Sequence, residues 1–141
     1  MVLPVPPVEN PSYVSQGLEF HTIQETVDLG TAAANFSLTE TIPANANVVA
    51  VALHVPSTIT AATAVKIGVG RVTSTADPDK YYLTSALTAG EFAKTYGGWG
   101  TPLAADETVG VFACDTNGAA AGTIGASGQY VIVRIVYTLP K

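Results

Sequence analysis

The sequence is short of charge, of cysteine and of long apolar runs. Charged residues make up 12% of its 141 residues, and eleven Asp and Glu against six Lys and Arg give a formal net charge of -5. Nucleic acid and anionic membranes are bound by clustered basic side chains, and the basic residues here are scattered. No apolar stretch approaches the roughly 20 residues that a membrane-spanning helix needs. We therefore expect neither nucleic acid nor a membrane as a partner.

The single cysteine, Cys114, leaves no disulfide possible within one chain. Stability must then come from packing or from assembly, and synthesis in a reducing compartment is compatible with this composition. Residues 1–7 read MVLPVPP and lack the basic start of a signal peptide. Their prolines would also interrupt the apolar helix of such a peptide, so we expect no export by that route.

The N-terminal region is predicted to be an extended arm that precedes one domain. Its first eleven residues contain four prolines, which fix the backbone near the polyproline II conformation and remove hydrogen-bond donors. We place the arm at 1–16 and the domain at 17–141, a length that suits one hydrophobic core. The apolar residues expected to contact a partner are Val2, Leu3, Val5 and Val8. A stiff apolar arm loses little entropy when it docks in a groove, and a disordered tail is the alternative.

Eight short stretches have the alternating or β-branched pattern of strands, and none has the period of a long helix. They cover residues 18–29, 34–38, 48–55, 64–70, 81–83, 88–95, 108–114 and 129–139. The stretch 88–95 also fits one helical turn. In the first stretch Phe20 is out of phase with Ile23, which predicts a bulge near His21 and Thr22. The sequence Asp77-Pro78-Asp79-Lys80 predicts a turn.

The spacing of these strands predicts an all-β fold, a single jelly-roll-like antiparallel β-sandwich. The stretch 115–128 contains four glycines and is expected to be a loop rather than a helix. Two strands, Val48 to Val55 and Tyr130 to Leu139, are apolar on both faces, whereas a strand of a small sandwich usually has one face in water. The arm, the loop 115–128 or a second subunit is expected to cover the extra face, so we predict a homo-oligomer.

The sequence offers little that could hold a metal ion. His21 and His54 lie in strand patterns without the ligand spacing of a zinc site, and structural roles are expected for both. Two pairs of residues have the spacing of calcium ligands, but no glutamate closes either series. These pairs are Asp77 with Asp79 and Asp115 with Asn117. Turn formation is the favoured interpretation, so we expect no metal site and no cofactor.

A catalytic site is not expected either, and a small hydrolase is the least favoured of the functions considered. Cys114 continues the phase of its strand, which indicates a buried structural thiol. The acids that a glycosidase would need are Glu91, Asp106 and Glu107, all at loop edges where exposed acids are common. The stretch 68–70 reads GVG, without the third glycine or the following helix of a dinucleotide site.

Four aromatic residues lie close together in the sequence and could anchor a partner. They are Tyr81, Tyr82, Tyr96 and Trp99, within about twenty residues. Exposed tyrosine and tryptophan are preferred at protein interfaces and sugar-binding surfaces. The alternative is that these rings close the open ends of the sandwich.

Four segments together resemble a β-rich module of tailed-bacteriophage structural proteins. They are IPANA at 42–46, VVAV at 48–51, ITAATAVKIGV at 59–69 and DPDKY at 77–81. The resemblance is to small capsid decoration (cement) proteins and fibre-tip domains, which use jelly-roll or related β-sandwich folds, and it covers about residues 31–139. It transfers no individual binding residue.

The resemblance implies a virion protein that is made in the bacterial host cytoplasm and clamps the joints of a phage head. Such a protein would bind the major capsid protein as a trimer over symmetry axes, with its N-terminal arm reaching across a neighbouring coat protein. The alternative implied function is a fibre or tail-tip module that binds a host glycan or receptor through the four aromatic residues.

Overall fold

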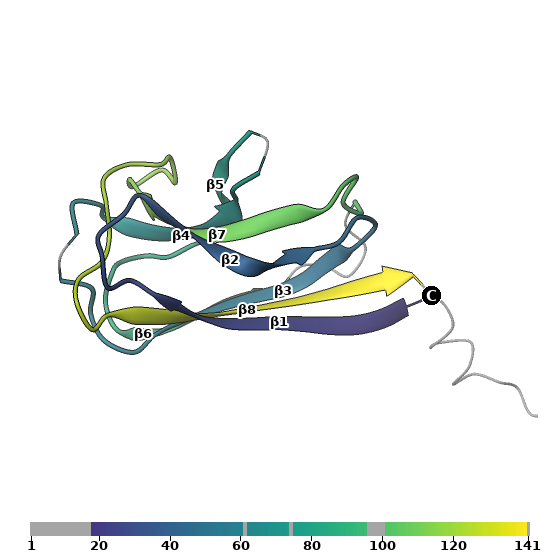
Figure 1. The fold of residues 1–141 in the computed structure, drawn as a ribbon, viewed down its shortest axis with the longest axis horizontal. Helices are drawn as coiled ribbons and strands as arrows, with labels where there is room; N and C mark the ends of the chain where they lie inside the picture. The colour runs from purple at the N-terminus through teal and green to yellow at the C-terminus, as the bar shows by residue number, and fades with distance from the viewer. Residues whose placement is uncertain (1–17, 61, 74, 96–100, 141) are drawn as a thin grey trace, which may run out of the picture.

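The computed structural model describes residues 18–60, 62–73, 75–95 and 101–140. Within these ranges the chain forms eight strands and no helix (Figure 1). The strands are β1 (Leu18–Asp28), β2 (Asn35–Ile42), β3 (Asn47–Val55), β4 (Lys66–Arg71), β5 (Asp77–Leu83), β6 (Gly90–Thr95), β7 (Glu107–Cys114) and β8 (Tyr130–Pro140). In the described part of the chain no helix is long and apolar enough to cross a membrane.

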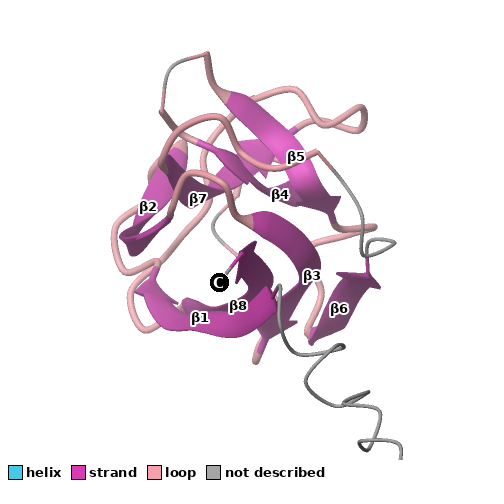
Figure 2. Ribbon diagram, turned by 90° about the vertical axis from the view of Figure 1, so that its right-hand side faces the viewer, coloured by secondary structure: helices cyan, strands magenta, loops and turns pink. Residues whose placement is uncertain are grey.

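The strands form two four-stranded antiparallel sheets that pack face to face (Figure 2). The first sheet has the order β1-β8-β3-β6 and the second has the order β2-β7-β4-β5. The pairs β1/β8, β2/β7, β3/β6 and β4/β5 are therefore nested, as they are when a long antiparallel hairpin is rolled up into a jelly roll. The predicted all-β antiparallel β-sandwich is confirmed.

The core lies between the sheets and is built from alternate residues of the strands. Its large aliphatic strand residues with the lowest exposure are Ile23, Ile42, Val51, Leu53, Val55, Ile67, Val69, Val109, Val111, Val131, Val133 and Ile135. Their β-branched and leucine side chains suit a pleated, two-layered interior. In β1 and β2 the alternation that predicted the strands also identified the side that faces the core, whereas β3 and β8 are apolar on both faces.

Two local predictions are wrong. The pairing of β1 with β8 is continuous from Leu18 opposite Pro140 to Asp28 opposite Tyr130, so no bulge occurs near 21–22. Phe20 is out of phase because its side chain lies on the outer face, where it is 70% exposed. The second correction concerns 77–80, which is the beginning of β5 and not a turn. Pairing with β4 outweighs the local turn preference of the Asp-Pro sequence.

The stretch 115–128 is a loop, as predicted, and it is tied to the sandwich. Ile124 is fully buried and forms bridges with Ala33 and Ala62. All four glycines of the loop have a positive φ, a conformation that L-residues with a side chain rarely adopt. The loop therefore closes one end of the sandwich. The predicted arm, at 1–16, lies outside the described residues.

Candidate functional site

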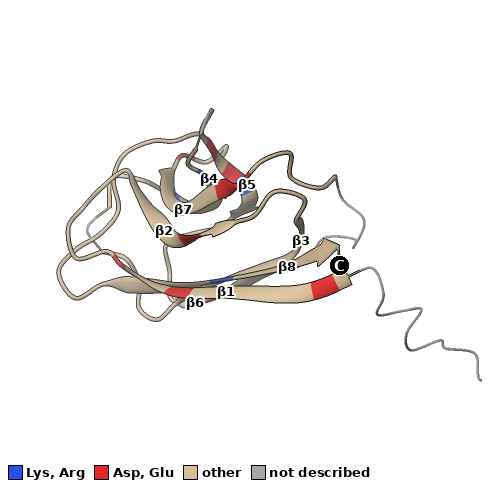
Figure 3. Cartoon of the chain, turned by 45° about the vertical axis from the view of Figure 1, so that its right-hand side comes forward, with Lys and Arg blue, Asp and Glu red and all other residues tan. Residues whose placement is uncertain are grey.

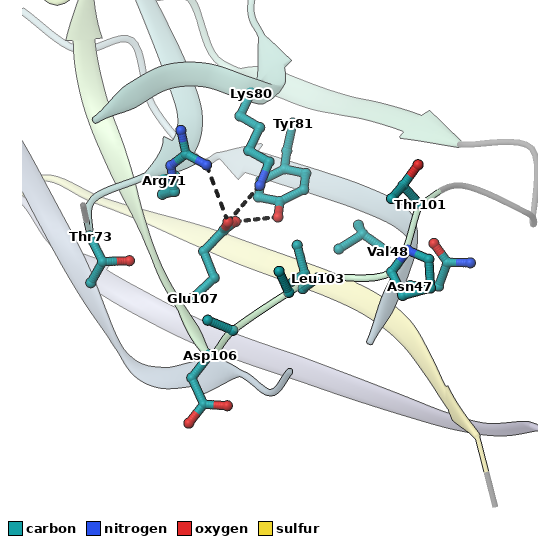
Figure 4. Close-up of a pocket in the computed structure, with 13 residues that line it drawn as sticks. Asn47, Val48, Arg71, Thr73, Lys80, Tyr81, Thr101, Leu103, Asp106 and Glu107 are labelled. Carbon is teal, nitrogen blue, oxygen red and sulfur yellow. Dashed lines mark hydrogen bonds and ion pairs between the residues drawn. The ribbon is translucent and has the colours of Figure 1, made fainter. Parts of the chain in front are cut away.

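A buried carboxylate, Glu107, forms the centre of the most polar cluster in the structure. It is the first residue of β7, and its side chain is only 6% exposed. Nζ of Lys80 donates a hydrogen bond of 2.5 Å to Oε2, and the hydroxyl of Tyr81 donates to Oε1 (Figure 4). Nη1 of Arg71 lies 3.9 Å from Oε2. Because an unpaired buried carboxylate is costly, these partners are what allow Glu107 to be buried.

The register of β5 brings Lys80 and Tyr81 to the same carboxylate. Adjacent residues of a regular strand point to opposite faces. Here Val69 of β4 pairs with Tyr82 and Arg71 pairs with Asp77, so the register shifts between them. Gly70 alone in β4 therefore lies opposite the whole segment 78–81 of β5. This irregular segment of β5 can direct two consecutive side chains toward Glu107.

Glycine makes this arrangement possible, because β5 crosses very close to β4. A Cβ added to Gly70 would lie 2.5 Å from the carbonyl carbon of Pro78, and closer still to the carbonyl oxygen of Asp77. An added Cβ at Gly68 would lie 2.8 Å from Sγ of Cys114 and would also meet the backbone of Pro78. The GVG sequence at 68–70 therefore serves the close approach of two strands.

The Glu107 cluster forms one wall of a pocket of about 540 Å³. The opposite wall is mostly apolar and comes from the beginning of β3 and from the segment that leads into β7. Its apolar members are Val48, Pro102, Leu103, Ala104 and Ala105. The carboxylate of Asp106 accepts a hydrogen bond from the Ala44 amide and points away from Glu107 (Figure 4). We call this cavity the end pocket.

The expectation that Glu107 is an exposed loop-edge acid is wrong. Glu107 begins a strand and is buried, whereas Glu91 is exposed, as expected. Two of the six basic residues of the chain approach Glu107. The sequence contained no local signal for this cluster, because Arg71, Lys80 and Glu107 come from three different strands.

The second candidate is the outer face of the first sheet. Its side chains form three rows across β1, β8, β3 and β6, and each row is a set of directly paired residues. The rows are Thr22-Val136-Ala50-Thr95, Gln24-Arg134-Ala52-Ala93 and Thr26-Ile132-His54-Glu91. We call these twelve residues the open face. Most of them are small or uncharged, and charged positions are sparse along this sheet (Figure 3).

A shallow hollow of about 450 Å³ lies on the open face. Ala52 and Ala93 form its low centre, since their side chains are the smallest in their row. Around them the long side chains are tied to one another. Nε of Arg134 donates to Oε1 of Gln24 at 2.8 Å, and Nδ1 of His54 lies 3.6 Å from the Glu91 carboxylate. The hollow therefore has an apolar floor and a polar rim.

The outer face of the second sheet differs because the chain covers it. Phe112 and Cys114 alternate with the core residues of β7, so they point outward, yet they are 3% and 0% exposed. The beginning of β5 passes over this side, with Pro78 close to Gly68 and to Cys114. On the first sheet Ala50, Ala52, Ile132 and Val136 are half-buried, and no segment among the described residues forms such a layer over them. Within the described part of the chain, the outer face of the first sheet is therefore the more open of the two.

The aromatic candidates are placed differently from one another. Tyr81 is buried, with its hydroxyl on Glu107, while Tyr82 is half-buried and its ring centroid lies 6.4 Å from that of Phe92. Tyr96, Trp99 and the arm candidates Val2, Leu3, Val5 and Val8 lie outside the described residues. The structure does not bring Tyr81 and Tyr82 together on one exposed surface. A partner-binding role for these eight residues stays a prediction.

The residues considered for metal or thiol chemistry have structural contacts. His21 stacks on Tyr137 with ring centroids 5.3 Å apart. Burial raises the pKa of the Cys114 thiol to about 11, and the charge of Asp79 adds to this effect. Asp115 accepts hydrogen bonds from the amides of 117 and 119, as a turn-forming aspartate does. Among the described residues no group of three or more His, Cys, Asp or Glu side chains could hold a metal ion.

Comparisons with known proteins give one structural match. No protein-family model matches the chain, and no curated protein matches it in sequence. A chain of the capsid asymmetric unit of cyanophage Pam1 is similar in structure, with a TM-score of 0.42 and 19% sequence identity. The alignment covers 99% of this chain and 94% of that chain. A TM-score at this level is too low to assign a shared fold or function.

Proposed function

We propose that this chain is a structural protein of a bacteriophage virion that decorates the capsid and stabilises it. It binds the lattice of the major capsid protein as a trimer, acts at the capsid surface after synthesis in the host cytoplasm, and carries out no catalysis. The resemblance of the segments between 31 and 139 supports the class of protein. The open face of the first sheet is the observation that carries the proposal, because it is the surface best suited to a protein neighbour.

The chemistry of the open face suits a protein partner. Association of proteins is driven mainly by burying apolar surface, and charged residues are depleted at the centre of interfaces. The centre of this face is built from the small residues Ala50, Ala52 and Ala93 with Ile132 and Val136. The nearest charge is Arg134, whose Nε–H is bonded to the Gln24 amide oxygen, and Glu91 lies beside His54 at the edge strand. A trimer on a repeating lattice also gains avidity, so each contact alone need not be strong.

A charge placed at the centre of the open face tests the proposal. Ala50→Glu should weaken binding to the capsids of its own virus by about tenfold or more, because its carboxylate would be desolvated between the uncharged Val136 and Thr95. The matched control is Ser37→Glu, an exposed position on β2 in the other sheet. Cosedimentation with capsids measures both. Equal binding of A50E and wild type would exclude the open face as the docking surface.

The solution mass tests the assembly. Light scattering should give a molar mass in solution of three times the 14.4 kDa of one chain. If the free protein has a lower mass, it should reach three chains per binding site on capsids. A protein that is a strict monomer and does not bind capsids would contradict the whole proposal.

Deletion of residues 1–11 tests the role of the arm. It should weaken capsid binding and leave the far-ultraviolet circular dichroism spectrum of the β-sandwich unchanged. A truncated protein that decorates heads as well as the full chain would contradict the role of the arm.

The alternative function, a fibre or tail-tip module that binds a glycan, has less support from the described residues. Stacking on a sugar needs an exposed ring face. Tyr81 is buried, and Tyr82 is half-buried against Phe92. A specific hit on a glycan array that Trp99→Ala abolishes would favour this alternative over capsid decoration.

A further inference from the structure

The Glu107 cluster has more positive than negative charge at the pocket wall. Lys80 and Tyr81 already donate hydrogen bonds to the two oxygens of Glu107. Arg71 is the additional cation, and its Nη1 is 3.9 Å from the carboxylate, which is longer than a hydrogen bond. The cluster of Arg71, Lys80 and Glu107 thus has a formal charge of one positive unit in a chain of net charge -5.

The guanidinium of Arg71 is held at one side and has donors left on the other. Its Nε donates to the carbonyl oxygen of Thr75 at 2.8 Å, which fixes the plane of the group. Among the residues that the structure describes, the terminal nitrogens have no acceptor within hydrogen-bond distance. A guanidinium fixed in this way is prepared to bind a carboxylate through two parallel hydrogen bonds.

The rest of the end pocket selects among anions. Its volume of about 540 Å³ exceeds what a bare carboxylate fills, and the wall opposite Arg71 is apolar, with Val48, Pro102 and Leu103. A phosphate dianion would be opposed by the carboxylates of Glu107 and Asp106, which both line the pocket. A single carboxylate on an apolar stem fits the charge and the lining.

We propose that the end pocket binds a monocarboxylate on an apolar stem, with the guanidinium of Arg71 as the group that pairs with the carboxylate. Two sources share this chemistry: the acidic side chain of an apolar protein segment and a free aliphatic or aromatic acid. The site lies apart from the open face, so it is independent of the proposed capsid contact. In a decoration protein it would add a second, charge-dependent attachment point.

The test uses the full chain and two pairs of matched probes. The first pair is 3-phenylpropionate and 3-phenylpropionamide, which have the same apolar stem and similar size but carry a carboxylate and a neutral amide. The second is a capped pentapeptide with a central glutamate flanked by leucine and proline, and its glutamine counterpart. Nuclear magnetic resonance titration should show that each acid binds and that each amide does not, with shifts at the Arg71 Nε–H and at the amides of Thr73, Leu103 and Asp106. Tighter binding of the peptide assigns a protein segment, and equal or tighter binding of the free acid assigns a small molecule.

Substitution separates the pocket from general charge effects. Arg71→Gln should weaken binding of the acids by about tenfold or more, the usual worth of a charge-assisted pair. The matched control, Arg134→Gln on the open face, removes the same charge and should leave binding unchanged. Because the chemical-shift changes are recorded on wild-type protein, they test the location of the site even if R71Q is unstable. Shifts elsewhere, equal binding of the amides or an unaffected R71Q would each overturn the proposal, whatever the outcome of the capsid experiments.

Discussion

Oε2 of Glu107 lies 2.5 Å from Nζ of Lys80, and this contact joins the beginning of β7 to β5 across the second sheet. The ammonium group also lies 5.1 Å from the centre of the Tyr81 ring. The sandwich thus buries the carboxylate of Glu107, and the side chains of Lys80 and Tyr81 donate hydrogen bonds to it. The same arrangement leaves Arg71 available to the end pocket, so stability and binding depend on one cluster.

Loss of the Lys80 ammonium should destabilise the fold. Removing one partner of a fully buried ion pair costs about 3 to 5 kcal/mol. The Lys80 side chain is 24% exposed and Tyr81 remains, so we expect Lys80→Met to lower the free energy of unfolding by about 2 kcal/mol. Urea denaturation measures the change. Lys66→Met is the control, because Lys66 donates only to the carbonyl of Thr116 at an exposed position.

A second substitution distinguishes pairing from packing. Glu107→Gln combined with Lys80→Met should cost less than the sum of the two single changes, because the buried carboxylate and its nearest cation are removed together and only the partly exposed Arg71 keeps its charge. Additive losses, or equal effects of K80M and Lys66→Met, would show that the ion pair contributes little.

The close approach of β5 to β4 predicts opposite effects for two glycines. Gly70→Ala should lower the free energy of unfolding by about 3 kcal/mol, because the new Cβ would overlap backbone atoms of Asp77 and Pro78 that cannot rotate away. Gly90→Ala is the control, since the nearest atom to its added Cβ is Cζ of Phe92 at 3.5 Å, an ordinary contact. We expect G90A to unfold at the same or slightly higher urea concentration. A Gly70→Ala protein as stable as wild type would contradict the crossing.

Burial makes the thiol of Cys114 unreactive. It also makes the contribution of Cys114 to the free energy of unfolding depend on pH. The pKa rises from an ordinary value of 9.0 to about 11 in the folded state. The folded protein therefore retains the proton longer than the unfolded chain, so the contribution is complete below about pH 9 and is lost as the pH rises toward 11. The Cys114→Ala protein should not lose this part of its free energy of unfolding at alkaline pH. Urea midpoints of wild type and C114A, measured at about pH 8 and about pH 10, will show the difference.

The same burial can be checked with a thiol reagent. Native protein at about pH 8 should react with a disulfide reagent only on unfolding, because the thiolate is scarce and covered. Rapid stoichiometric labelling of native protein would show that Cys114 is exposed. The control is the same reaction in denaturing urea, which should be complete.

The sequence predicted the strands well because alternation is a local signal. Each of the eight expected stretches overlaps a strand, and the stretch 88–95, which also fitted a helical turn, contains β6. The bounds predicted from Val48 to Val55 differ from those of β3 by one residue. The turn expected at 77–80 was wrong because Asp77 pairs with Arg71 of β4 and the Pro78 backbone lies against Gly68 and Gly70, and a local pattern does not contain these contacts. The Glu107 cluster was missed for the same reason, since its cations are 27 and 36 positions away in the chain.

The two-sided apolar strands were informative in part. They predicted an outer face that needs a cover, and the outward apolar residues of β3 and β8 on the open face are half-buried. The loop 115–128 was one expected cover, but its bridges lead to Ala33, Ala62 and Cys114. Strand β7 is also apolar on both faces, and there the chain supplies its own cover. Periodicity gives the faces of a strand, and only the packing of distant segments decides which face stays open.

Glu25 connects the two sheets and should set part of the acid stability. Its carboxylate accepts hydrogen bonds of 2.9 Å from the amide and hydroxyl of Thr39 and from the amide of Glu40. Burial raises the pKa of Glu25, but these hydrogen bonds outweigh it and hold the pKa below its ordinary value of 4.5. Because the folded pKa is the lower one, the contribution is present above pH 4.5 and is lost as the pH falls through the folded value. Glu25→Gln should cost about 1 kcal/mol at neutral pH, since the amide cannot accept all three bonds. Urea unfolding at about pH 7 and about pH 3 should show the two proteins converging in acid. A constant difference at both pH values would mean that the charge of Glu25 does not stabilise the link between the sheets.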